Sequence, residues 1–124
     1  MMEIISVAVG GALGAVCRYL LGNFISRASG SALPWGTFAI NIIGCFCMGL
    51  LMTLIVERGM LPAAWCLFLC VGLLGGFTTF SSFGYESLML LTEGNIAAAA
   101  AYSGGSLLLG LLAAGTGVLA GKGV

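Results

Sequence analysis

Four long apolar stretches follow one another along the chain, separated by short polar segments. They cover residues 4–24, 36–56, 62–91 and 95–120. A helix needs roughly 20 mostly apolar residues to cross the ~30 Å hydrocarbon core of a bilayer. The pattern therefore predicts an all-α membrane protein whose four transmembrane helices form one domain, residues 1–124, within the lipid bilayer.

The segments between the stretches carry signals typical of membrane boundaries. Residues 26–34 are polar and contain glycine and serine, and Trp35 follows them as an interfacial aromatic residue. The second stretch ends at residues 57–59, Glu-Arg-Gly. Pro62 then stands where a helix start accepts proline, followed by a second interfacial residue, Trp65.

The third stretch is too long for one simple span and contains the run GLLGGFTTFSSF at residues 72–83. Paired glycines, threonines and serines are poor choices for a lipid-facing helix centre. We therefore predict a break at Gly75-Gly76, within residues 75–79. Unwound backbone at membrane depth must be buried in protein or line a wet cavity, where it can hold ions. The alternative interpretation is a packing notch in an intact helix.

Composition excludes several other classes of protein. Hydrophobic residues make up 60% of the chain and charged residues only 6%, too few to cover a soluble domain. The net charge is zero, so nothing indicates a nucleic-acid partner. The chain has no histidine, the commonest metal ligand and proton shuttle.

The five cysteines all lie inside apolar stretches, and we interpret them as packing or lipid-facing residues. Cys45 and Cys47 are two apart, so on a helix they face different ways. Cys66 and Cys70 can share a face, but no other ligand-type side chain accompanies them in the sequence.

The basic residues give almost no orientation bias. Arg58 and Lys122 fall on one side of the membrane, and Arg27 falls on the other, with Arg18 toward that end of its helix. Topology follows an excess of Lys and Arg on the cytoplasmic side. A chain without this excess can insert both ways, and four short helices enclose too little for a pathway. We therefore expect an antiparallel, dual-topology homodimer.

Intramembrane polar residues are costly, so each is a candidate for function. Arg18 is the one deep cation, although it can also extend to an interface. Asn41 can donate its amide to an anion or clamp two helices. Tyr102, Ser106 and Gly110 recur every four residues and form one polar stripe that ends in a gap.

Two further pairs lie in the third stretch. Ser82 and Glu86 are four apart and share a helix face. Phe80 and Phe83 are three apart, a spacing that usually serves packing. Their positively polarised ring edges can alternatively meet an anion.

Three motifs together resemble the Fluc (CrcB) family of fluoride channels. The run at residues 72–83 closely resembles the family signature. GGALGAVCRY at residues 10–19 and GTFAINIIG at residues 36–44 resemble the other two motifs. All three occur in the family's order, so the resemblance covers the whole architecture.

This resemblance implies a dual-topology homodimer in the bacterial inner membrane, with two antiparallel pores that conduct fluoride passively. It implies a central Na⁺ held by the backbone carbonyls of Gly75 and Thr78 from each chain, and an aqueous pore entrance near Arg18. The implied pore residues are Asn41, Phe80, Ser82, Phe83, Glu86, Tyr102 and Ser106. Some members carry a serine where this chain has Gly110, so that end of the stripe has no named ligand.

Physical chemistry is consistent with such a pore and leaves two rivals. Fluoride is strongly hydrated, so a pore must replace water with donors without trapping the ion. One rival is a small proton-coupled multidrug exporter, which depends on a carboxylate deep in its first helix. Here that helix offers only Glu3 at its start. The other rival is a non-conducting assembly subunit, in which the polar cluster is replaceable.

Overall fold

The computed structural model describes residues 1–124 and is entirely helical. The first, second and fourth segments are α1 (Met2–Ser29), α2 (Trp35–Met52) with its π-helical continuation η1 (Thr53–Glu57), and α6 (Ile96–Gly123). The third segment is composite: α3 (Ala64–Cys66), π-helical η2 (Leu67–Leu74), α4 (Gly75–Phe77) and α5 (Phe80–Thr92). All four segments are long and apolar enough to span a membrane, which confirms the predicted fold class.

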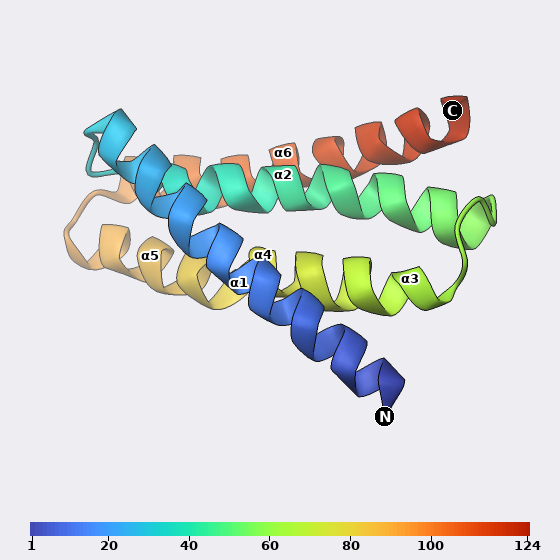
Figure 1. The fold of residues 1–124 in the computed structure, drawn as a ribbon. Coiled ribbons are helices and arrows are strands. Elements are labelled where there is room, and N and C mark those ends of the chain that lie inside the picture. The colour runs from blue at the N-terminus through green and yellow to red at the C-terminus, as the bar shows by residue number, and fades with distance from the viewer.

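The four segments form an elongated bundle (Figure 1). Helices α2 and α6 run side by side, the third segment lies along them, and α1 crosses the third segment obliquely. Both termini lie at the same end of the bundle, as an even number of spans requires.

Helix boundaries follow local chemistry. Helix α1 continues past residue 24, where the sequence predicted its end, because the polar side chains that follow are exposed and do not interrupt it. It stops at Gly30, whose φ of 58° is left-handed and favours glycine. Helix α6 begins after Asn95, whose side chain accepts a hydrogen bond of 3.2 Å from the Ala98 N–H.

Small residues set the approach of α1 to the third segment. Gly10 and Gly14 are buried against η2 and α4. A methyl group added at Gly10 would lie 2.9 Å from the backbone nitrogen of Leu73, too close for any real side chain. The small-xxx-small pair in the first stretch therefore lets two backbones pack directly on each other.

Most large apolar side chains lie on the outside. Only 17 of the 124 residues are buried, and exposed leucines line much of α6. This surface suits hydrocarbon rather than water. A small buried cluster of Leu90, Ala99 and Tyr102 joins α5 to α6.

Candidate functional site

The break in the third segment lies at Thr78 and Thr79. Thr78 has φ −84° and ψ 159°, and Thr79 has φ −149° and ψ 113°, so both residues are extended between two helices. These residues fall within the predicted range 75–79, but the break does not lie at the Gly75-Gly76 pair itself, because both glycines belong to α4.

One of the two glycines, Gly76, has a packing role next to the break. A methyl group at Gly76 would lie 3.1 Å from the Cα atom of Gly11 and 3.2 Å from the backbone nitrogen of Ala15. Gly76 therefore lets α1 pass close to α4. A methyl group at Gly75 would meet nothing nearer than 3.8 Å, so this glycine faces open space in the single chain.

Asn41 of α2 stabilises the opened backbone. Its Nδ2 donates to the Thr79 carbonyl at 3.1 Å, and its Oδ1 accepts from the Thr79 N–H at 2.9 Å. These bonds replace the helical partners that Thr79 lacks, and unpaired backbone groups are costly inside a membrane. The amide keeps a second N–H, which is free of this clamp.

Hydroxyl groups satisfy the helix ends on both sides of the break. Thr78 Oγ1 donates to the Leu74 carbonyl at 2.9 Å. Thr79 caps α5, since its Oγ1 accepts from the Ser82 N–H at 3.2 Å and donates to Ser82 Oγ at 3.0 Å. Ser82, a predicted pore residue, is therefore part of this cap.

Arg18 lies beside the break. Its Nε donates to the Gly76 carbonyl at 3.0 Å, and the residue is partly buried. The contact neutralises part of the negative end of α4, where carbonyls lack helical partners. Within one chain Arg18 thus holds α1 against the third segment, and its role at a pore entrance stays a prediction.

A cavity of about 350 Å³ opens next to the break. Its lining residues come from α2, the break, α5 and α6: Asn41, Gly44, Cys45, Met48, Thr78, Thr79, Phe80, Phe83, Ser106 and Leu107. Ser106 Oγ is buried and has no hydrogen-bond partner within the chain. A buried hydroxyl without a partner is unusual in a folded protein, so this atom marks a place for a ligand.

The two candidate phenylalanines differ in exposure. The rings of Phe80 and Phe83 lie 5.9 Å apart and are tilted by 45°. Phe80 is 84% exposed, whereas Phe83 also packs on Tyr102 at 5.4 Å. Phe83 is thus fixed within the chain, and Phe80 projects from its surface.

Glu86 and Tyr102 lie outside the cavity lining and form a polar network with a third residue. Thr37 Oγ1 donates to Glu86 Oε1, and Tyr102 OH donates to Glu86 Oε2, both at 2.8 Å. The network joins α2, α5 and α6. Both carboxyl oxygens therefore accept hydrogen bonds, so Glu86 is paired within the chain.

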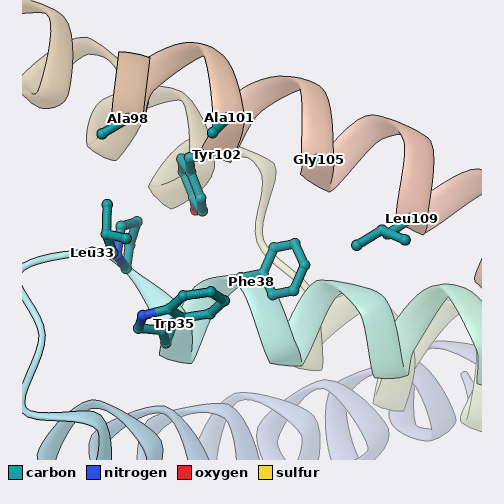
Figure 2. Close-up of a pocket in the computed structure, with 9 residues that line it drawn as sticks. Leu33, Trp35, Phe38, Ala98, Ala101, Tyr102, Gly105 and Leu109 are labelled. Atoms are coloured by element: carbon teal, nitrogen blue, oxygen red, sulfur yellow. The ribbon is translucent and has the colours of Figure 1, made fainter. Parts of the chain in front are cut away.

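A second, apolar cavity is lined in part by Tyr102. It also measures about 350 Å³ and is lined by residues of α2, α6 and the segment before α2. Figure 2 shows Trp35 and Phe38 on one wall and the α6 residues on the other. Its lining offers few polar groups, so the polar chemistry is concentrated at the break.

The structure brings together Asn41, Phe80, Phe83 and Ser106, and links Glu86 to Tyr102 nearby. The sequence places Thr37 one turn before Asn41 on the same helix face, but Thr37 was not among the predicted pore residues, and the structure joins it to this region through Glu86. Sequence reasoning missed the bridge in which Ser103 Oγ donates to Ser87 Oγ at 3.0 Å. No spacing within one helix reveals a contact between α5 and α6.

These features define a multi-pass membrane protein with a polar site at a broken helix. Residues 5–118 match the family model described as CrcB-like protein, Camphor Resistance (CrcB), and the chain belongs to this family.

Curated relatives cover nearly the whole chain. The protein of Chloroflexus aurantiacus named fluoride-specific ion channel FluC is 48% identical over 122 residues, 98% of this chain and 97% of its own length. Proteins of the same name from Acidobacterium capsulatum and Thermus thermophilus are 44% and 50% identical. They match 98% and 87% of this chain, and 97% and 84% of their own lengths.

Proposed function

We propose that this chain is a passive, selective fluoride channel that lets fluoride leave the bacterial cytoplasm. The names of its relatives support an ion channel for fluoride, rather than an enzyme. The observation that carries the proposal is the cavity at the break, which is lined by Ser106, a residue whose buried hydroxyl has no partner in the chain.

The cavity chemistry suits a small, strongly hydrated anion. Ser106 Oγ–H and the second Nδ2–H of Asn41 are donors without a partner in the chain, and the cavity holds no carboxylate. Phenyl rings add positively polarised edges without a fixed charge. Such donors replace water around the ion, and their neutrality keeps binding weak enough for conduction.

The conducting unit is a pair of oppositely oriented copies. Phe80 is 84% exposed although it lines the candidate pathway, so a second chain is needed to enclose it. The near-zero bias of Lys and Arg between the two sides allows both orientations. In the pair, Phe80 and Phe83 would both lie along the pores.

A sodium ion at the centre of the pair is a further part of the proposal. The Thr78 carbonyl accepts no hydrogen bond within the chain, and no side chain donates to the Gly75 carbonyl. Carbonyl oxygens suit a hard cation, and two copies of Gly75 and Thr78 would supply four. The ion would add positive potential near the pores without entering them.

Export follows from passive conduction alone. When a cell stands in an acidic medium, fluoride enters it as the neutral acid. The acid loses its proton in the more neutral cytoplasm, and the anion is trapped there. A channel then lets fluoride run outward down its gradient.

The rival function, a proton-coupled cation exporter, needs an available membrane carboxylate. Glu3 lies at the start of α1, and Glu86 uses both oxygens for hydrogen bonds.

Efflux from proteoliposomes tests the proposal. Purified protein is reconstituted with internal fluoride, and a fluoride electrode follows release after a potassium ionophore removes the electrical block. We expect fast fluoride efflux and slow chloride efflux from matched vesicles. Absence of fluoride efflux, or chloride efflux at the same rate, would refute the proposal.

Two further measurements address the dimer and the sodium ion. A reporter fused to the C-terminus should be found on both sides of the membrane, and a one-sided result would exclude dual topology. Replacing Na⁺ by a large organic cation during purification should reduce efflux. Equal rates with and without Na⁺ would remove sodium from the proposal while leaving the fluoride pathway intact.

A further inference from the structure

The polar stripe along α6 ends at a residue that has no side chain. Tyr102 and Ser106 are one turn apart, and Gly110 follows one turn later. A Cβ atom built at Gly110 would lie 3.4 Å from its nearest neighbour, the Sγ atom of Cys45 on α2. A sulfur atom of the facing helix therefore borders the place at which the stripe would continue.

The register of α2 and α6 places Cys45 beside the candidate pathway. The two helices run in the same direction, so successive turns of one lie beside successive turns of the other (Figure 1). Cys45 lies at Gly110, and one turn earlier the same register places Asn41 at the level of Ser106. Asn41, Cys45 and Ser106 all line the cavity at the break. The thiol thus lies one turn beyond the two donors already assigned to the pathway.

We propose that the Cys45 thiol is a further fluoride donor, at the place that Gly110 leaves without a side chain. This inference rests on the proposed channel function. Cys45 is a free, half-buried cysteine, and its thiol forms no hydrogen bond within the chain. The buried Ser106 hydroxyl on the same lining also has no partner, and unsatisfied buried polar groups are rare unless a ligand or water meets them.

The chemistry of a thiol suits this position. The S–H group is a neutral donor and is weaker than a hydroxyl group. A weak, uncharged donor can replace part of the water around a passing anion without trapping it. Met48 follows Cys45 on the same wall of the cavity, but its thioether has no hydrogen to donate. Cys45 is therefore the last side-chain donor on the α2 wall.

Efflux of fluoride from proteoliposomes, with a potassium ionophore present, tests the thiol. Cys45→Ala removes the donor, and we expect efflux to slow about 2- to 10-fold, the range for loss of one hydrogen bond. Cys45→Ser replaces the thiol by a hydroxyl of similar size, and efflux should stay at or above the wild-type rate. A cysteine that only packs predicts no such difference between alanine and serine.

Cys47→Ala is the matched control on the same helix. Cys47 is also half-buried, but it is two residues further along α2 and does not line the cavity. Its efflux should stay near the wild-type rate. Equal losses in Cys45→Ala and Cys47→Ala would overturn the assignment, because they would trace the effect to packing of α2.

Rescue from the facing helix locates the donor independently. In the Cys45→Ala background the sulfur next to Gly110 is gone, so Gly110→Ser has room for its side chain there. We expect this second substitution to restore a large part of the lost rate. Gly104→Ser in the same background is the control, since Gly104 lies on α6 outside the cavity lining, and it should restore nothing.

The outcomes separate this inference from the channel itself. Wild-type protein without fluoride efflux would overturn both. Wild-type efflux that Cys45→Ala matches, or that Cys45→Ser loses to the same extent as Cys45→Ala, would overturn the thiol donor alone. Size-exclusion elution and circular dichroism check that each variant is folded. If Cys45→Ala does not fold, the isosteric pair Cys45→Thr and Cys45→Val replaces it, and the threonine variant should conduct faster.

Discussion

Helices α2 and α6 lie side by side along the bundle, and the two ends of their contact are built differently. Near the start of α2, Thr37 meets Tyr102 through the carboxyl group of Glu86 on α5. Near its end, Gly49 packs on the backbone at Ala114, and α6 returns the contact through Gly117. One end is joined by hydrogen bonds and the other by direct backbone packing.

The difference separates two ways of holding helices together in lipid. Apolar side chains gain little by leaving hydrocarbon for a helix interface, so close packing and hydrogen bonds must supply the attraction. The glycine end leaves no room for even a methyl group. The polar end adjoins a cavity of about 350 Å³ and an unpartnered hydroxyl at Ser106. The residues that hold α2 and α6 together by close packing and the residues proposed to contact the ion thus lie at different positions along the same helix pair.

The largest expected effect comes from changing the polar end with Asn41→Asp. The substitution replaces the donor to the Thr79 carbonyl by an oxygen and puts a carboxylate beside the cavity. A negative charge about 4 Å from a passing anion opposes it by about 4 kcal/mol at an effective dielectric constant near 20. We expect fluoride efflux from proteoliposomes to fall on the order of 100-fold or more.

Asn23→Asp is the matched control for this charge. Asn23 is exposed on α1 and away from the cavity, so efflux should stay near the wild-type rate. Similar losses in both variants would mean that the Asn41 result reflects net charge or yield, and the comparison between the two ends would fail.

The glycine end is tested by Gly117→Ala. The added methyl carbon would lie 2.9 Å from the backbone nitrogen of Leu50, so the two helices must separate. Overpacking of this kind typically costs about 1–3 kcal/mol. We expect a lower unfolding temperature in detergent, followed by circular dichroism.

Gly115→Ala supplies the control two residues away on the same helix. A methyl group there meets nothing within 4 Å, and alanine favours a helix over glycine by about 1 kcal/mol. Its unfolding temperature should therefore stay the same or rise. If both variants lose stability equally, direct packing of Gly117 on α2 does not explain how this end of the α2–α6 contact is stabilised.

The sequence predicted the fold well because its signals are local. Four apolar stretches of spanning length correspond to the four helical segments, and Gly10 and Gly14 mark a true packing face. The break lies within the predicted residues 75–79 but not at the glycine pair, for a physical reason. Glycine disfavours helix, so residues 75–76 are expected to break it, but both belong to α4, and Gly76 instead allows the close approach of α1. The extended residues in the break are threonines. Their hydroxyl groups and the Asn41 amide form hydrogen bonds with the backbone groups on the two sides of the break.

The site was predicted only in part because its geometry is not local. Asn41, Phe80, Phe83 and Ser106 meet at one cavity, as candidate pore residues should. Their individual tasks depend on partners from other helices, and spacing along one helix cannot reveal them. Asn41, for example, was open to an anion-binding or a clamping role; the structure establishes the clamp and leaves one amide N–H outside it.

The smallest expected effect distinguishes two serines three residues apart on α6. Ser106 Oγ is buried without a partner, so Ser106→Ala removes no hydrogen bond from the folded chain but removes a donor from the cavity. Efflux should fall about 2- to 10-fold, with the unfolding temperature unchanged. Ser103→Ala instead removes the bond to Ser87 and should cost about 1 kcal/mol of stability, with efflux near normal. The opposite assignment of the two effects would mean that hydroxyls outside the cavity contact the ion, because only a group facing the pathway can slow conduction without weakening the fold.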